Sequence, residues 1–190
     1  NGAGKSALAA LLAGYGELHD GALTSDFKRI QLVSYESQQA LIEQEREKDS
    51  ADILDVIAVP TKVHELLCAG DDSDERECYS LQSPLCLRLI ELFNFSALLS
   101  RDFVALSTGE TRKLLLIKAL MAKPDLLILD EPFDGLDADM QLRLRQLLNE
   151  LSLDITMVFV LNRWSEIPQF VSHYGLVSQG KLESTITAKD

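Results

Sequence analysis

The sequence lacks the long apolar runs and the cysteine spacing that mark several protein classes. No apolar stretch approaches the roughly 18–20 residues that cross a bilayer, and no signal peptide is visible. The three cysteines, Cys68, Cys78 and Cys86, form no C-x-x-C pair, so we interpret them as reduced thiols of a cytoplasmic protein. The three histidines lie far apart along the chain and indicate no metal site.

Positive charge is also scarce. The chain has 18 Lys and Arg residues against 30 Asp and Glu residues, a formal net charge of −12. Between Glu43 and Glu77 there are twelve acidic residues and four basic ones, which indicates a solvated surface or an insertion. Nonspecific binding to nucleic acid or to anionic lipid needs a basic face, so we expect no nucleic-acid partner.

What is present begins at the first residue. The segment NGAGKS is the back part of the phosphate-binding pattern G-x-x-x-x-G-K-[ST], whose first glycine and preceding strand would come before it. Glycines let successive backbone N–H groups point into one concavity that holds phosphate oxygens. The alternative without function is a glycine-rich turn that caps a helix. A chance match to the phosphate-loop pattern in a chain of this length is expected well under ~5% of the time. The candidate phosphate-binding residues are Asn1, Gly2, Ala3, Gly4, Lys5 and Ser6.

Hydrophobic periodicity predicts alternating helices and strands. We expect a parallel α/β sheet because the run LLIL is continuous and apolar, as in a strand buried on both faces. The expected strands are 27–35, 126–129 and 155–161, followed by a hairpin at 175–183. The expected helices are 5–12, 37–48, 51–59, 63–69, 84–99, 109–121, 138–151 and 165–171.

A pair of carboxylates ends the apolar strand at 126–129. In phosphate-loop enzymes an acidic residue at this place holds Mg²⁺, and Asp130 occupies it. Glu131 is placed to take a proton from an attacking water or to orient that water. The alternative is that these two carboxylates have no catalytic role and only end a strand or cap a helix. With Asp130, the Ser6 hydroxyl is the second candidate ligand of Mg²⁺.

The third motif, LSTGE, precedes the helix expected at 109–121. The Ser107 hydroxyl and the Gly109 N–H would lie at a helix N-terminus, where they can bind an anion. Ser107 and Glu110 also have the spacing of an ordinary capping box. The order along the chain favours the functional interpretation: phosphate loop, helical insert, LSTGE, then LLILDE about twenty residues later.

That order resembles the ATP-binding cassette (ABC) family of ATPases over nearly the whole chain. NGAGKS is similar to the Walker A motif, LSTGE to the signature motif, LLILDEP to the Walker B motif and DGLD to the D-loop. In more detail, the stretch from LSTGE to DGLD and the segment VLNRWSEIP resemble the first half of ModF-type proteins. These are bacterial tandem cassettes named for a link to molybdate transport.

The resemblance implies an ABC-type P-loop NTPase, α/β with a parallel core sheet and an inserted helical subdomain. The expected layout is one cassette domain, 1–190, truncated at its N-terminus, with a core at 1–37 and 106–190 and a helical insert at 38–105. It also implies ATP and Mg²⁺ as cofactors and a second cassette as partner, in the same chain or as a homodimer. Ser107 and Gly109 would then contact the γ-phosphate of the nucleotide held by that partner, and Asp137 of the D-loop would lie at the interface.

One departure from the family pattern affects the expected catalytic residues, and the position of the glutamine loop is open between three residues. The family usually has a histidine after the strand that follows Walker B, and Asn162 stands there. Asparagine can hydrogen-bond a phosphate but cannot become cationic. Asn162 is therefore a candidate catalytic residue, beside Glu131, of a site with slow turnover. For the glutamine loop the candidates are Glu36, Gln38 and Gln39, of which we favour Gln38.

Three functional hypotheses remain open from the sequence. The first is a cassette that hydrolyses ATP to drive import of molybdate or another anion through a membrane permease, with peripheral attachment at the inner membrane as an option. The second is a soluble ATP-dependent regulatory or repair switch. The third is a degenerate cassette that binds ATP without efficient hydrolysis, which Asn162 favours.

Overall fold

The computed structural model describes residues 4–51, 60–69 and 80–187, and these form two compact units. The first unit takes its residues from 1–34 and 124–190, the second from 35–123. The second unit is therefore wider than the insert predicted at 38–105. Most of the helix predicted at 51–59, the acidic stretch 70–77 and Cys78 lie outside the described residues.

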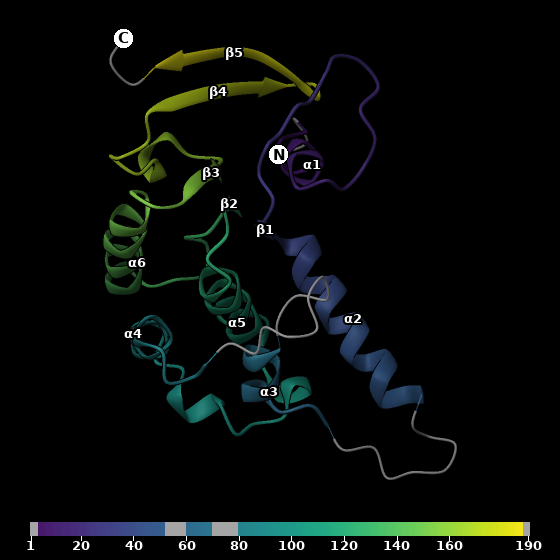
Figure 1. The fold of residues 1–190 in the computed structure, drawn as a ribbon, viewed down its shortest axis with the longest axis vertical. Coiled ribbons are helices and arrows are strands. Elements are labelled where there is room, and N and C mark those ends of the chain that lie inside the picture. Colours follow the sequence, from purple (N-terminus) through teal and green to yellow (C-terminus); the bar gives the residue numbers. More distant parts are fainter. Residues whose placement is uncertain (1–3, 52–59, 70–79, 188–190) are drawn as a thin grey trace. The chain divides into compact units, whose positions relative to one another are not determined.

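The first unit is built on a parallel sheet in the order β1-β2-β3, comprising β1 (Ile30–Val33), β2 (Leu126–Asp130) and β3 (Thr156–Val160) (Figure 1). All five residues of β2 are buried, as the continuous apolar run predicts. Asp125 sets the register at the start of the sheet, because its Oδ2 accepts hydrogen bonds from the backbone N–H of Arg29 at 2.9 Å and of Lys28 at 3.2 Å.

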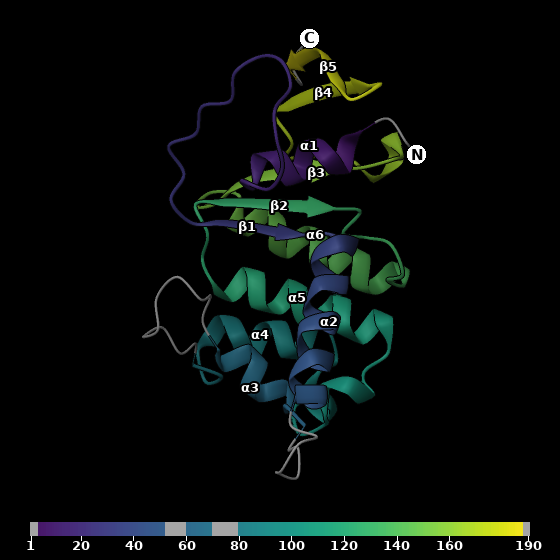
Figure 2. The same ribbon diagram turned by 90° about the vertical axis from the view of Figure 1, so that its right-hand side faces the viewer.

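Two helices cover this sheet. Figure 2 shows α1 (Lys5–Leu12) and α6 (Ala138–Leu151) on opposite faces of it. The contact with α1 is a small apolar core, because the helix is short and rich in alanine and leucine. That core consists of Ala9, Leu126, Ile128 and Val160, with Leu12, Ala13, Ile30, Leu32 and Val158 packed around it.

The first unit ends in an antiparallel hairpin, as the sequence predicts, of β4 (His173–Ser178) and β5 (Lys181–Thr187) (Figure 1). Its two turn residues, Gln179 and Gly180, have φ values of 49° and 75°. Positive φ at both positions is the geometry of the tight hairpin turns whose twist matches that of the strands. The strands extend beyond the predicted 175–183, and a bulge lies between Leu176 and Val177.

The second unit is helical. It contains α2 (Tyr35–Ala51), α3 (Val63–Cys68), α4 (Pro84–Leu92) and α5 (Thr108–Met121), with the short 3-10 helices η2 (Ser96–Leu98) and η3 (Phe103–Ala105). The helix α5 packs against α2, α3 and α4. Its buried side chains include Leu114, Ile117 and Leu120, which form the centre of this unit. In the described part of the chain, no helix is both long and apolar enough to span a bilayer.

Two helix predictions were wrong in extent. The helix predicted at 84–99 ends at Leu92, because Asn94 has a φ of 53° that a right-handed helix cannot accept. The helix predicted at 165–171 is only the 3-10 turn η4 (Trp164–Glu166). Pro168 explains this, since the residue before a proline is held in an extended conformation and Ile167 has a ψ of 123°.

We predict that Leu127→Ala lowers the free energy of unfolding by about 2–5 kcal/mol, because it leaves a cavity in the central strand. Leu127 is completely buried. Leu153→Ala is the matched control, since Leu153 is 88% exposed and should change stability by less than about 0.5 kcal/mol. Urea unfolding of both variants measures the difference; equal losses would contradict this account of the core.

Candidate nucleotide site

The first described residue of the chain has a backbone that only glycine accepts. Gly4 is the N-cap of α1 and has a φ of 88° and a ψ of 11°. A Cβ built on Gly4 would lie 2.6 Å from the Cα of Gly180 in the hairpin turn, which is closer than real Cβ contacts come. Both the left-handed conformation and the close backbone approach therefore require glycine at position 4.

The N-terminus of α1 is suited to an anion. Its first turn carries no acidic side chain, and its N-cap supplies no side-chain hydrogen bond. The backbone N–H groups of the first turn and the positive end of the helix dipole are thus left for a ligand. Lys5 is half-buried and Ser6 is exposed at this end. Asn1, Gly2 and Ala3 lie outside the described residues.

The acidic pair follows β2 directly. Asp130 is the last residue of the strand and is 8% exposed. Glu131 has a φ of 50°, and its N–H donates to the Val160 carbonyl at 2.9 Å, which extends the pairing with β3 by one bond. A non-glycine residue with positive φ costs of order 1–3 kcal/mol and persists where the surroundings enforce it. Such strain is common at functional sites, which supports a functional role for Glu131.

Burial raises the pKa of Glu131, and the nearby carboxylates of Asp134, Glu166 and Asp130 raise it further. The Lys5 ammonium opposes them and favours the ionised form. Carboxylate oxygens of Glu131, Asp134 and Glu166 all lie within 4.8 Å of one another.

The turn after β3 belongs to the same edge of the sheet. Val160 pairs with Asp130, so the exposed Asn162, two residues further on, follows β3 at the carboxyl end of the strands. In that turn Arg163 Nη1 lies 3.0 Å from Glu166 Oε1. Asp134 was predicted only as the first residue of the D-loop, and Glu166 was not predicted as a site residue. The signal available for both was proximity in sequence to a predicted site residue, Asp134 to Glu131 and Glu166 to Asn162.

The helix α6 fixes the loop between the acidic pair and itself. Gln141 donates from Nε2 to the carbonyl oxygens of Phe133 at 3.1 Å and Leu136 at 3.0 Å. One turn later, the Arg145 guanidinium stacks on the Phe133 ring at 3.8 Å, and its Nη1 donates to the Glu166 carbonyl at 2.6 Å. Burial lowers the pKa of Arg145, and the Glu166 carboxylate acts against this.

Three of the remaining predicted site residues, Asp137, Gln38 and Ser107, make hydrogen bonds within the fold. Asp137 is the N-cap of α6, and its Oδ1 accepts from the Met140 N–H at 2.9 Å. Gln38, Ser107 and Gly109 belong to the second unit. Gln38 is 1% exposed and donates from Nε2 to the Thr108 carbonyl at 2.7 Å. Its amide is therefore committed to the first turn of α5.

Ser107 caps that same helix. Its Oγ accepts from the Glu110 N–H at 3.3 Å, while Glu110 Oε2 accepts from the Ser107 N–H at 2.7 Å and from its hydroxyl at 2.8 Å. The capping box expected from the sequence is thus present. These hydrogen bonds lower the pKa of Glu110, the backbone bond most. Ser107 and Gly109 are exposed at the start of α5.

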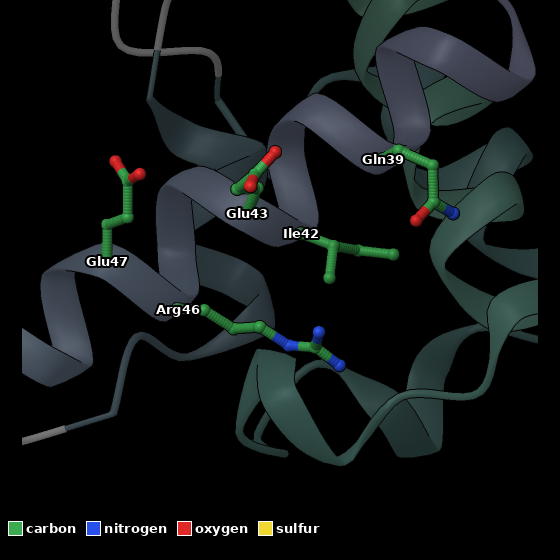
Figure 3. Close-up of a pocket in the computed structure, with 5 residues that line it drawn as sticks. All are labelled: Gln39, Ile42, Glu43, Arg46 and Glu47. Atoms are coloured by element: carbon green, nitrogen blue, oxygen red, sulfur yellow. The ribbon is translucent and has the colours of Figure 1, made fainter.

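The second unit also carries an open pocket of about 340 Å³ on α2 (Figure 3). Its lining side chains recur every three to four residues, which places them on one face of the helix. They mix two acidic groups and one basic group with an amide and an isoleucine, and the pocket has no glycine loop that could hold phosphates. The lining residues are Gln39, Ile42, Glu43, Arg46 and Glu47.

Comparison with known proteins agrees with the arrangement in the first unit. A family model described as "ABC transporter" matches residues 1–134. The chain is 42% identical, over 97% of its length, to "ABC transporter ATP-binding protein ModF" of Escherichia coli K12. It is 31% identical over 50% of its length to "Molybdenum import ATP-binding protein ModC" of Vibrio parahaemolyticus. The chain spans only 36% and 26% of these two relatives.

Solved structures show the same fold at low sequence identity. The "ATP binding subunit of ABC transporter" superposes with a TM-score of 0.71 at 19% identity, over 100% of this chain and 76% of that one. A nucleotide-free ATP-binding cassette from an ABC transporter gives a TM-score of 0.62 at 18% identity, over 98% and 77%. The expected fold class, a phosphate-loop cassette with a parallel sheet, is confirmed.

We predict that Arg145→Ala lowers the free energy of unfolding by about 1–2 kcal/mol, because it removes a cation–π contact and a charged hydrogen bond. Arg143→Ala on the same helix is the matched control. Arg143 makes an exposed ion pair with Asp139 at 2.9 Å, and loss of such a pair costs about 0.3–0.5 kcal/mol. Urea unfolding midpoints test the difference; equal shifts would contradict the bracing role of Arg145.

Proposed function

Because this chain belongs to the ABC transporter family, we propose that it is an ATP-binding cassette that binds Mg-ATP at residues 1–6 and hydrolyses it with Glu131. The observation that carries the proposal is the backbone of Gly4, whose φ of 88° and close approach to Gly180 give the N-terminus of α1 the geometry of a glycine-rich phosphate loop. The acidic pair after β2, Asp130 and Glu131, supplies a candidate metal ligand and a candidate base. ATP hydrolysis is the expected reaction in a family of ATPases.

Binding rests on the first turn of α1. The first turn itself carries no acidic side chain, so its backbone N–H groups and the helix dipole favour the triphosphate. Lys5 adds a positive charge for the β- and γ-phosphates. The hydroxyl of Ser6 and the carboxylate of Asp130 are hard oxygen donors that suit Mg²⁺. When bound, Mg²⁺ would neutralise charge on the phosphate oxygens.

Hydrolysis rests on Glu131. A general base works best when its pKa is close to the working pH, and burial with three neighbouring carboxylates moves the pKa of Glu131 in that direction. The strained backbone and the bond to Val160 fix its position. Glu131 accepts the proton of a water that attacks the γ-phosphorus. Asn162, at the same edge of the sheet, is placed to donate a hydrogen bond to the γ-phosphate.

The partners follow from family membership. ABC cassettes work in pairs, so we propose a second cassette, contacted by Ser107, Gly109 and Asp137 of this one. A membrane permease is the further partner if the protein drives import. The names of two relatives support an oxyanion such as molybdate as cargo: molybdenum import for ModC, and sulfate/thiosulfate import for CysA, which is 35% identical over half of this chain.

Co-purification distinguishes transport from a soluble switch. Recovery of a membrane permease with the full-length protein would support import. ATP-dependent association with a soluble complex, and no permease, would contradict the transport proposal while leaving the ATPase proposal intact.

We predict that Lys5→Ala weakens ATP binding by at least about 100-fold, which corresponds to ~2.7 kcal/mol, because the phosphates lose a charged partner. Calorimetric titration of the full-length protein with Mg-ATP measures the effect. The control is Lys28→Ala, which removes an exposed lysine of the same unit and should leave the affinity unchanged. Equal affinity of both variants would refute the assignment of the phosphate loop.

We predict that Glu131→Gln lowers the turnover number for ATP by about 10²–10⁴-fold and leaves ATP affinity intact, because it removes a base and keeps the size of the side chain. Steady-state phosphate release gives the rate, and titration gives the affinity. Glu91→Gln, on an exposed site of α4, is the control. Unchanged turnover in the Glu131 variant would rule this residue out as the base.

A further inference from the structure

The turn after β3 carries a cation beside the residue that departs from the family pattern. Asn162 stands where the resemblance leads us to expect a histidine, and asparagine cannot supply positive charge. The next residue, Arg163, carries a permanent positive charge, because the guanidinium group stays protonated in proteins. The Arg163 side chain is 70% exposed, so it is accessible to a ligand.

Arg163 lies against the carboxylate cluster that contains the proposed base. Its Nη1 is 3.0 Å from Glu166 Oε1. Oxygens of Glu166 lie within 4.8 Å of those of Glu131 and Asp134. Lys5 acts on the same cluster, since its charge favours ionised Glu131. The ion pair with Glu166 thus places the Arg163 guanidinium beside the cluster of carboxylates that contains the candidate base.

The strand register keeps this arrangement in place. Val160 pairs with Asp130 in the parallel sheet, and the Val160 carbonyl accepts the Glu131 N–H at 2.9 Å. Arg163 follows Val160 by three residues, so the turn that carries it begins next to the acidic pair. Its position does not depend on a long loop, and little conformational freedom separates it from Glu131.

The fold does not need Arg163 to hold this turn. Arg145 already does so, through its 2.6 Å bond to the Glu166 carbonyl and its contact with the Phe133 ring. The pair of Arg163 with Glu166 is a local i,i+3 contact with an exposed arginine, and exposed pairs contribute about 0–1 kcal/mol. A structural role for the guanidinium is therefore small, and its charge is available for chemistry.

We infer that Arg163 is a further catalytic residue, whose guanidinium contacts the γ-phosphate of ATP and supplies the charge that Asn162 lacks. This inference rests on the proposed function. In the reaction, the water oxygen forms a bond to the γ-phosphorus as the bond to the β,γ-bridging oxygen breaks. One water proton passes to Glu131, and ADP and phosphate leave. Arg163 stabilises negative charge on the γ-phosphoryl oxygens as the bonds exchange.

The test is steady-state ATP hydrolysis by the full-length protein. We expect Arg163→Ala to lower kcat by about 10²-fold, because charge stabilisation of the γ-phosphoryl group is lost, with KM for ATP changed less than about threefold. Arg163→Lys should recover part of the rate, since it restores charge without the planar fork. Arg143→Ala, an exposed arginine of α6, should have no effect.

Two further variants separate catalysis from structure. Glu166→Gln breaks the same ion pair but keeps the guanidinium, so we expect a much smaller loss of kcat than in Arg163→Ala. Asn162→His added to Arg163→Ala should restore a large part of the rate by supplying a cation from the neighbouring position. Equal losses in the Arg163 and Glu166 variants, or no rescue by histidine, would overturn the inference.

The wild-type protein separates this inference from the function on which it rests. Failure of the wild type to bind ATP would overturn the proposed function, and the role of Arg163 with it. Normal binding with no measurable hydrolysis would overturn both the inference and the hydrolytic part of the proposed function, and would leave only ATP binding. Normal hydrolysis with an inactive Lys5→Ala variant and a fully active Arg163→Ala variant would overturn the inference alone.

Discussion

The hydrogen bond from the Glu131 N–H to the Val160 carbonyl is the contact on which the candidate site depends. It continues the pairing of β2 and β3 one step past the end of β2, and there the backbone of Glu131 has a φ of 50°. The carboxylate follows the strand without a flexible linker. Parallel pairing also starts the turn with Asn162 and Arg163 beside it. One backbone bond thus fixes the spacing of an acid, an amide and a cation.

The second organising element is α6. Gln141 and Arg145 lie one turn apart on this helix, and they hold two segments distant in sequence, the loop after Glu131 and the turn after β3. Asp137 caps the same helix at the end that is proposed to face the partner cassette. A helix is stiff over this length, so its contacts at both loops keep the polar groups at constant separation. This explains how a site made mostly of loop residues is held in place.

The sequence predicted the framework of the first unit well, for physical reasons. The apolar run of β2 is buried on both faces. A strand buried in this way must be apolar at every position, so its location can be predicted from the sequence. The helix at 138–151 was predicted at its observed bounds, since Asp137 gives it a clear start. The hairpin turn is marked by Gly180, which accepts positive φ.

Other features had no local signal. The strained backbone of Glu131 accompanies a hydrogen bond to Val160, 29 residues away in sequence, and no pattern near Glu131 indicates that bond. The cluster with Glu166 depends in the same way on the register of two strands. Gln38, predicted for the glutamine loop, donates from its amide to the carbonyl of Thr108, seventy residues later, a contact that no local pattern indicates. Hydrophobic periodicity indicates which face of a helix or strand is buried. It does not indicate which distant polar group a side chain will hydrogen-bond.

The close approach of Gly4 and Gly180 has an asymmetric consequence for how this protein can diverge. A Cβ on Gly4 would collide with backbone, which cannot move aside as a side chain would. A Cβ on Gly180 would meet nothing within 4 Å, so only its φ of 75° restricts the residue there. Asparagine and aspartate tolerate that conformation. Over evolutionary time the residue at the hairpin tip is therefore open to substitution, while position 4 must remain glycine.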